Sequence, residues 1–167
     1  MKISLLISAI ALALPAFAQS PPASNVKEQF VGTWKLISVE QRRPNGEIVY
    51  PRGKAPAGLL IYDRSGHMAV QIMNENNPGA SPDAALDQLK AAVGGYGAYF
   101  GTYEVQEKEG FVVHNVQGSL FKSYRDSHQK RFFEFSGNRL VLTPPPVTVD
   151  GETRTTRLTW ERVARTD

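Results

Sequence analysis

Residues 97–106 read GAYFGTYEVQ and residues 111–120 read FVVHNVQGSL, with the short sequence EKEG between them. Aromatic and β-branched residues alternate with polar ones on both sides of a loop that ends in glycine, which indicates two antiparallel strands joined as a hairpin. In the register that this loop sets, Tyr103 lies opposite His114. The direction of the imidazole then matters, because a buried histidine needs a hydrogen-bonding partner.

Alternation along the two strands separates a polar face from a mainly apolar one. The polar face carries Thr102, Glu104, Gln106, Val113, Asn115, Gln117 and Ser119. The face that we expect to point inward carries Tyr99, Gly101, Tyr103, Val105, Val112, His114, Val116, Gly118 and Leu120. His114 and Tyr103 are therefore predicted to be cross-strand neighbours in the interior.

Short segments of the same type, separated by turn residues, run along most of the chain. We expect strands at residues 34–42, 48–50, 58–62, 67–73, 99–106, 111–121, 130–135, 139–143 and 155–163. Eight or nine short strands predict an all-β domain, either a closed antiparallel barrel or a sandwich. One short helix is expected at residues 82–93, with Ser81 as N-cap and Pro82 in its first turn.

Inward positions on the other strands combine large apolar groups with polar ones. They are Trp34, Leu36, Ser38, Glu40, Arg131, Phe133, Phe135, Leu140, Leu142, Leu158 and Trp160. A buried arginine must be paired and a buried histidine hydrogen-bonded. A barrel that encloses a cavity meets this need, because polar groups in it can bind water or a ligand.

The N-terminus has the three parts of a secretory signal peptide: a basic start, an apolar run and a small-residue cleavage site ending at Ala18. We expect cleavage after Ala18, which makes Gln19 the mature N-terminus and places the protein in the periplasm or outside the cell. The domains predicted are a signal peptide at residues 1–18, a flexible Pro-rich leader at 19–25 and one β-barrel domain at 26–167.

Composition argues against several classes of function. The chain has no cysteine, which excludes thiol catalysis, thiolate metal sites and disulfides. Its formal charge of +3 is scattered, so neither nucleic-acid binding nor stable membrane insertion is expected. The three histidines are far apart with no carboxylate at metal-binding spacing, and we expect no metal and no cofactor.

Several segments resemble the bacterial and fungal lipocalin-like domain family, whose members are calycin-type barrels. They occur in order over nearly the whole mature chain: GTWKLIS (32–38), GLLIY (58–62), GHMAVQ (66–71), YGAYFGTY (96–103), VHNV (113–116), QKRF (129–132) and LTWER (158–162). The resemblance implies an eight-stranded up-and-down antiparallel barrel around a central cavity, with Arg162 packed over Trp34 at one end. It carries over no catalytic motif.

Two hypotheses of function follow. In the first, an exported barrel binds a small hydrophobic molecule, and the predicted ligand-binding residues are Tyr99, Tyr103, His114, Arg131, Phe133 and Phe135. The alternative is a cofactor-independent isomerase or cyclase in which His114 or Tyr103 acts as acid or base. The sequence leaves open whether the protein is an enzyme, and it names no protein partner.

Overall fold

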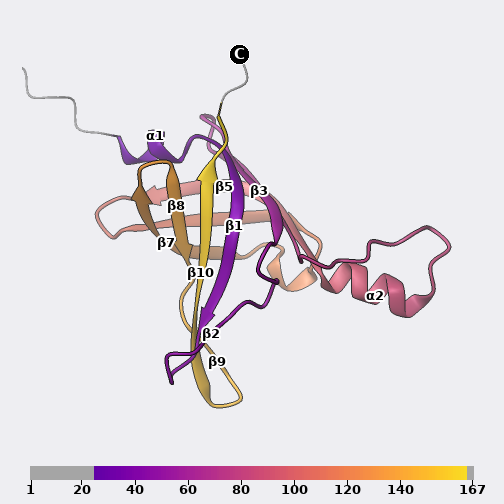
Figure 1. Cartoon of the computed structure of the whole chain (residues 1–167). Coiled ribbons are helices and arrows are strands. Elements are labelled where there is room, and N and C mark those ends of the chain that lie inside the picture. Colours follow the sequence, from indigo (N-terminus) through magenta and orange to yellow (C-terminus); the bar gives the residue numbers. More distant parts are fainter. Residues whose placement is uncertain (1–24, 165–167) are drawn as a thin grey trace, which may run out of the picture.

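The computed structural model describes residues 25–164, in which eight antiparallel strands form a closed barrel (Figure 1). In spatial order they are β1 (Gly32–Arg42), β3 (Ala57–Tyr62), β4 (His67–Met73), β5 (Tyr96–Gln106), β6 (Phe111–Ser119), β7 (His128–Ser136), β8 (Arg139–Thr143) and β10 (Glu152–Arg162). Pairing of β1 with β10 closes the ring. The predicted barrel is confirmed. The predicted signal peptide, and all of the predicted leader except Asn25, lie outside the described residues.

Two further strands extend the ring on one side. β2 (Ile48–Val49) pairs with the end of β1, and β9 (Val147–Val149) pairs with the start of β10. Both lie at the same end of the barrel and lengthen its wall there, below the ring in Figure 1.

The opposite end of the barrel is closed by the short helix α1 (Val26–Phe30). Phe30 is fully buried and packs edge-on against Tyr62, Phe133 and Phe135. Trp34 donates from its indole nitrogen to the Phe30 carbonyl oxygen at 2.8 Å. α1 therefore plugs the barrel with an aromatic cluster.

Arg162 fixes α1 in place. Its guanidinium lies 4.1 Å from the centre of the Trp34 ring and donates to the carbonyl oxygens of Gln29 and Val31. Because one of these carbonyls lies in the last turn of α1 and the other directly follows it, the arginine ties the plug to the last strand. This is the arrangement that the family resemblance implied for Trp34 and Arg162.

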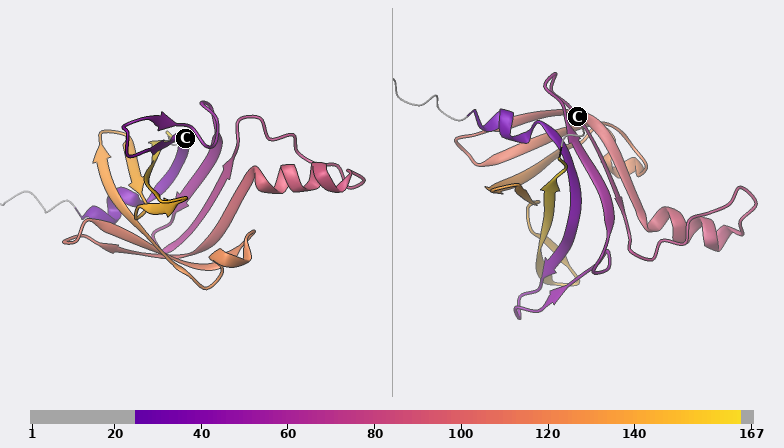
Figure 2. Two further views of the ribbon diagram at one scale, coloured as in Figure 1. Left: turned by 90° about the horizontal axis from the view of Figure 1, so that it is seen from below. Right: turned by 45° about the horizontal axis from the view of Figure 1, so that its top comes forward.

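The longer helix lies outside the barrel. α2 (Leu86–Gly94) projects from the wall on the long connection between β4 and β5, and none of its residues is buried (Figures 1 and 2). It begins later than predicted and Ser81 is not its N-cap, because residues 81–84 form a turn in which Ala84 donates to the Ser81 carbonyl. A single-turn 3₁₀ helix, η1 (Lys122–Tyr124), follows β6.

Two β-bulges change which side chains face inward. The first lies between Leu36 and Ser38 and turns Val39, not Ser38 or Glu40, into the interior. The expectation for Ser38 and Glu40 was therefore wrong, because a bulge adds one residue and reverses the alternation beyond it.

The second bulge lies in the hairpin of β5 and β6, between Phe100 and Gly101. Between the bulge and the turn the predicted register holds, with Tyr103 opposite His114. On the far side of the bulge the faces of β6 exchange while Tyr99 on β5 still faces inward: Ser119 lines the interior, whereas Leu120 is 46% exposed. The inward direction predicted for Leu120 was wrong for the same reason as in β1.

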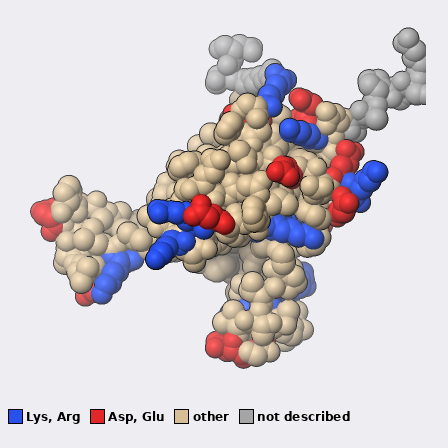
Figure 3. All heavy atoms as spheres, turned by 180° about the vertical axis from the view of Figure 1, so that it is seen from behind, with Lys and Arg blue, Asp and Glu red and all other residues tan. Residues whose placement is uncertain are grey.

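The outer surface has no single-signed charged region on the face drawn in Figure 3, where acidic and basic side chains are interspersed. Within residues 25–164, no helix has the length and apolar character needed to cross a lipid bilayer.

Candidate functional site

The barrel encloses a cavity of about 600 Å³ between the aromatic plug and the extended end. This volume falls in the range of roughly 300–1,000 Å³ typical of pockets for small organic molecules. The apolar part of its wall comes from β1, β3, β4, β8, β10 and the loop after β8. These elements contribute Val39, Leu60, Val70, Ile72, Leu142, Pro144, Pro145, Pro146, Leu158 and Trp160.

The polar part of the wall comes mainly from β5, β6 and β7. On these strands and the η1 segment it includes Tyr99, His114, Ser119, Tyr124, Gln129 and Arg131. Most of the polar lining residues thus lie on one side of the cavity, and Arg52 and Thr156 add polar groups from elsewhere in the wall.

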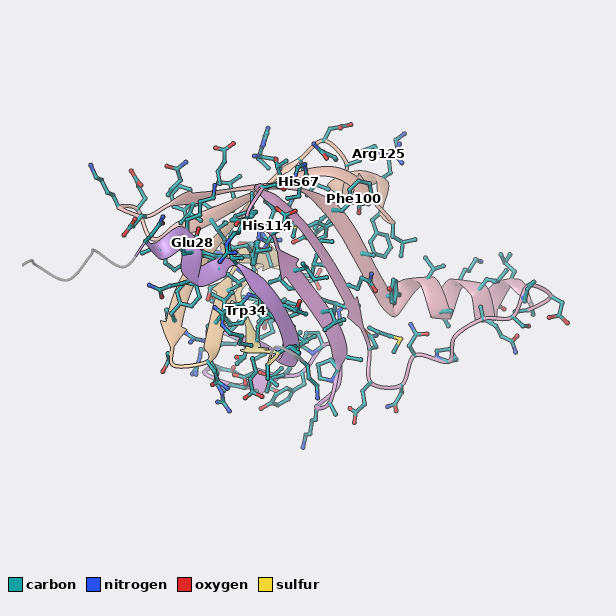
Figure 4. All side chains as sticks on the ribbon, turned by 90° about the horizontal axis from the view of Figure 1, so that it is seen from above. Glu28, Trp34, His67, Phe100, His114 and Arg125 are labelled. Carbon is teal, nitrogen blue, oxygen red and sulfur yellow. The ribbon has the colours of Figure 1, made fainter. Side chains whose placement is uncertain are left out.

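His114 lies inside the ring of strands, as Figure 4 shows, and only 1% of its surface is exposed. Its two ring nitrogens bind two phenols from different strands. Nε2 lies 2.6 Å from the Tyr62 hydroxyl, and Nδ1 lies 2.9 Å from the Tyr99 hydroxyl. The imidazole is therefore held on both sides.

The protonation state of this group follows from its burial. Desolvation by burial, followed by the positive charge of Arg131, lowers the pKa of His114 to about 3. Burial also raises the pKa of Tyr62 and of Tyr99. At neutral pH all three side chains are uncharged.

A neutral imidazole has one N–H and one lone pair, so one tyrosine donates to it and the other accepts. Tyr62 is 1% exposed, and its hydroxyl has no other hydrogen bond among the described residues. If Tyr62 accepted from the ring, its own hydrogen would be buried without a partner, which is costly. This assigns Tyr62 as donor to Nε2 and Tyr99 as acceptor from Nδ1–H.

The Tyr99 hydroxyl group keeps a free hydrogen. Its oxygen accepts a hydrogen bond from His114, so its hydrogen can bind another acceptor. Because Tyr99 lines the cavity, that acceptor can be a molecule within it.

Arg131 is half-buried on β7 and lines the same polar side. Its guanidinium donates to the Lys130 carbonyl oxygen at 2.7 Å and to the Gln129 side-chain oxygen at 3.2 Å. Both acceptors are neutral.

The structure brings together three of the six predicted ligand-binding residues: Tyr99, His114 and Arg131 all line the cavity. Phe133 and Phe135 do not line it, because they pack beneath it against Phe30. Their part in binding, and that of the first three, stays a prediction.

Tyr103 also lies away from the cavity lining. It is 2% exposed and pairs with His114 across the hairpin, but its hydroxyl donates to the Asp63 carbonyl oxygen at 2.8 Å. This side chain faces the plugged end, where its ring meets Tyr62 at 4.7 Å between ring centres.

Sequence reasoning missed Tyr62, the second partner of His114. β3 and β6 are not adjacent, so the contact depends on the curvature of the closed barrel and leaves no spacing signal. It also missed Arg52, which lines the cavity from the loop before β3 and donates to the Asn74 side chain at 2.8 Å.

The other two histidines lie at the surface. His67 contacts Ser65 in the β3–β4 turn, and His128 contacts Asn115 on the outer face. Among residues 25–164, no three histidine or carboxylate side chains come together as metal ligands would.

Comparison with protein families identifies the type of domain. The family model described as a lipocalin-like domain matches residues 31–163, which spans the barrel from the start of β1 to the end of β10. No curated protein matches the chain significantly.

Proposed function

The chain belongs to the lipocalin-like domain family, and from this premise we propose that the protein binds one small, largely apolar molecule inside its barrel. Lipocalin-like barrels generally bind ligands of this kind. The observation that supports the proposal here is the cavity of about 600 Å³, whose apolar side spans five strands. Burying apolar ligand surface against such a wall is favourable by about 25 cal/mol per Å².

Gly97 offers a way to fill this cavity without disturbing the strands. It lines the cavity on β5, and a Cβ atom placed on it would meet nothing closer than 3.7 Å, the distance to an Arg52 nitrogen. A leucine at this position therefore directs its side chain into the cavity volume.

The test is a fluorescence titration with Nile red, an uncharged apolar dye. We expect saturable one-to-one binding to the wild-type protein and a loss of at least about tenfold in affinity in Gly97→Leu. Gly94→Leu is the matched control, because Gly94 ends α2 outside the cavity and has open space around it. Equal affinity in all three proteins would place the dye outside the barrel and contradict the proposal.

The alternative of a cofactor-independent isomerase or cyclase is favoured by one observation, the hydrogen-bonded chain Tyr62–His114–Tyr99. In this alternative Tyr99 carries the proton between His114 and a bound molecule, because Tyr103 is bonded to the Asp63 carbonyl instead. Turnover that collapses in Tyr99→Phe while binding survives would support catalysis.

We further propose that the protein acts after export, with Gln19 as the first residue of the mature chain. The proposal rests on the N-terminal sequence pattern. Sequencing the N-terminus of protein recovered from the periplasm or the medium checks it, and an intact Met1 on the functional protein would contradict it.

A further inference from the structure

The charged residues that line the cavity are all of one sign. Arg52 and Arg131 line it, and no aspartate or glutamate side chain among the described residues does. His114, the remaining titratable base there, is neutral. The cavity is thus a largely apolar space with a net positive charge on its wall.

Arg131 has no carboxylate partner among residues 25–164. Its guanidinium donates to a backbone carbonyl, to an amide oxygen and to the Tyr99 hydroxyl, all of them neutral, and it takes part in no ion pair among these residues. Holding a half-buried cation without a counter-charge costs free energy. An anion in the cavity would recover that cost.

The hydrogen-bonding groups next to Arg131 point to the same ligand chemistry. The tautomer of His114 leaves the Tyr99 hydroxyl free to donate into the cavity, and Arg131 lies within hydrogen-bonding reach of that hydroxyl, where its charge partly offsets the rise in the pKa of the phenol that burial causes. An arginine fork beside a phenolic donor suits a planar anion that accepts several hydrogen bonds, such as a carboxylate.

The apolar wall contains one buried hydrogen-bond donor, the indole nitrogen of Trp160. The indole nitrogen of Trp160 is buried and has no hydrogen-bond acceptor among the described residues, although the ring lines the cavity. The lining therefore offers donors from Arg131, Tyr99 and Trp160 but no acidic acceptor to compete for them.

We propose that the natural occupant is a small amphipathic anion whose carboxylate binds Arg131 and the Tyr99 hydroxyl, with its hydrocarbon part against the apolar wall. This inference rests on the proposed function, since it names the chemical class of the molecule bound at that site. It excludes cationic and uncharged lipids as preferred ligands.

The test compares three probes that have the same ten-carbon chain and different head groups: decanoate, 1-decanol and decyltrimethylammonium. Displacement of Nile red measures their affinities at pH 7.5. We expect decanoate to bind at least about tenfold more tightly than decanol, as a charge-assisted hydrogen bond predicts, and the cation to bind most weakly.

The variant Arg131→Gln should remove this preference. Decanoate should lose about tenfold in affinity and decanol should change by less than about threefold. Lys35→Gln is the matched control, because it removes one positive charge from an exposed position on β1 that does not line the cavity. Arg131→Lys, which keeps the charge but loses the fork, should fall between wild type and Arg131→Gln.

The outcomes separate the inference from the proposed function. If Nile red binds but decanol equals or exceeds decanoate, or Arg131→Gln behaves like Lys35→Gln, the anionic head group is overturned and the binding function stands. If neither Nile red nor any of the three probes binds, the binding function itself fails. Should Arg131→Gln not fold, the wild-type ranking and Arg131→Lys still decide the question.

Discussion

His114 links the stability of the barrel to pH. Its pKa in the folded protein is lowered from 6.5 to about 3 by burial, so the unfolded chain binds a proton more readily than the folded protein does. The folded state therefore gains stability from keeping His114 neutral; this contribution is fully present above about pH 6.5 and is lost as the pH falls toward about 3. Each pKa unit corresponds to about 1.4 kcal/mol.

We therefore expect the free energy of unfolding to fall between pH 6.5 and pH 4, with a slope that is much smaller in His114→Gln. Urea unfolding at several pH values measures this. His128→Gln is the control, because that histidine is exposed on the outer face and its replacement should leave the slope unchanged. If wild type and His114→Gln showed the same slope, the imidazole would not be buried and neutral.

At the residue scale, the sequence predicted which side chains of the hairpin point inward, but not which side chains they touch. Alternation within the hairpin was enough to point His114 and Tyr103 inward, because both lie on the same side of the β5–β6 bulge. It could not show that the hydroxyl of Tyr62 reaches His114, since that depends on how the barrel curves. Nor could it separate Tyr99, which lines the cavity, from Tyr103, which does not.

At the element scale, the bulge in the β5–β6 hairpin decides which residues reach the cavity. It depends on Gly101, where an added Cβ atom would lie 2.0 Å from the carbonyl oxygen of Asn115. Backbone atoms cannot move away as a flexible side chain can. A larger residue at this position must therefore shift the two strands apart.

We expect Gly101→Ala to lower the free energy of unfolding by roughly 2–4 kcal/mol. Gly97→Ala is the matched control on the same strand, since its Cβ atom would meet only ordinary contacts at 3.7 Å or more. Chemical denaturation measures the free energy of unfolding of the wild type and of both variants. Similar stability in both would show that the strands do not approach so closely at Gly101.

Most strands were predicted from alternation because it is a local property of each segment. The bulges were not, since an extra residue between paired strands is set by the partner strand; they reversed the expectation for Ser38, Glu40 and Leu120. The start of α2 was missed because the proline that suits a first helical turn also suits the tight turn that residues 81–84 form.

At the scale of the whole molecule, the two ends of the barrel have different roles. One end is closed by a packed plug made of α1 with its Phe30, together with Trp34 and Arg162. The cavity lies between this plug and the end of the barrel that β2 and β9 extend. The family resemblance implied closure of one end at Trp34 and Arg162, and the structure has this pair there. The size of the cavity depends on how eight strands tilt together, which no single segment encodes.

The two tryptophans provide reporters at these two places. The indole N–H of Trp160 lies in the cavity wall without an acceptor among the described residues, whereas that of Trp34 is bonded to the Phe30 carbonyl within the plug. In a ¹H–¹⁵N correlation spectrum each gives one indole signal, which Trp34→Phe assigns. A molecule bound in the cavity should affect the first signal and leave the second in place.

Titration of the ¹⁵N-labelled protein with decanoate, followed through these two indole signals, tests cavity binding most directly. We expect the Trp160 signal to shift saturably with one-to-one stoichiometry while the Trp34 signal stays within its line width. A Trp160 signal that does not move at saturating decanoate, or a shift of equal size for both tryptophans, would contradict binding inside the barrel.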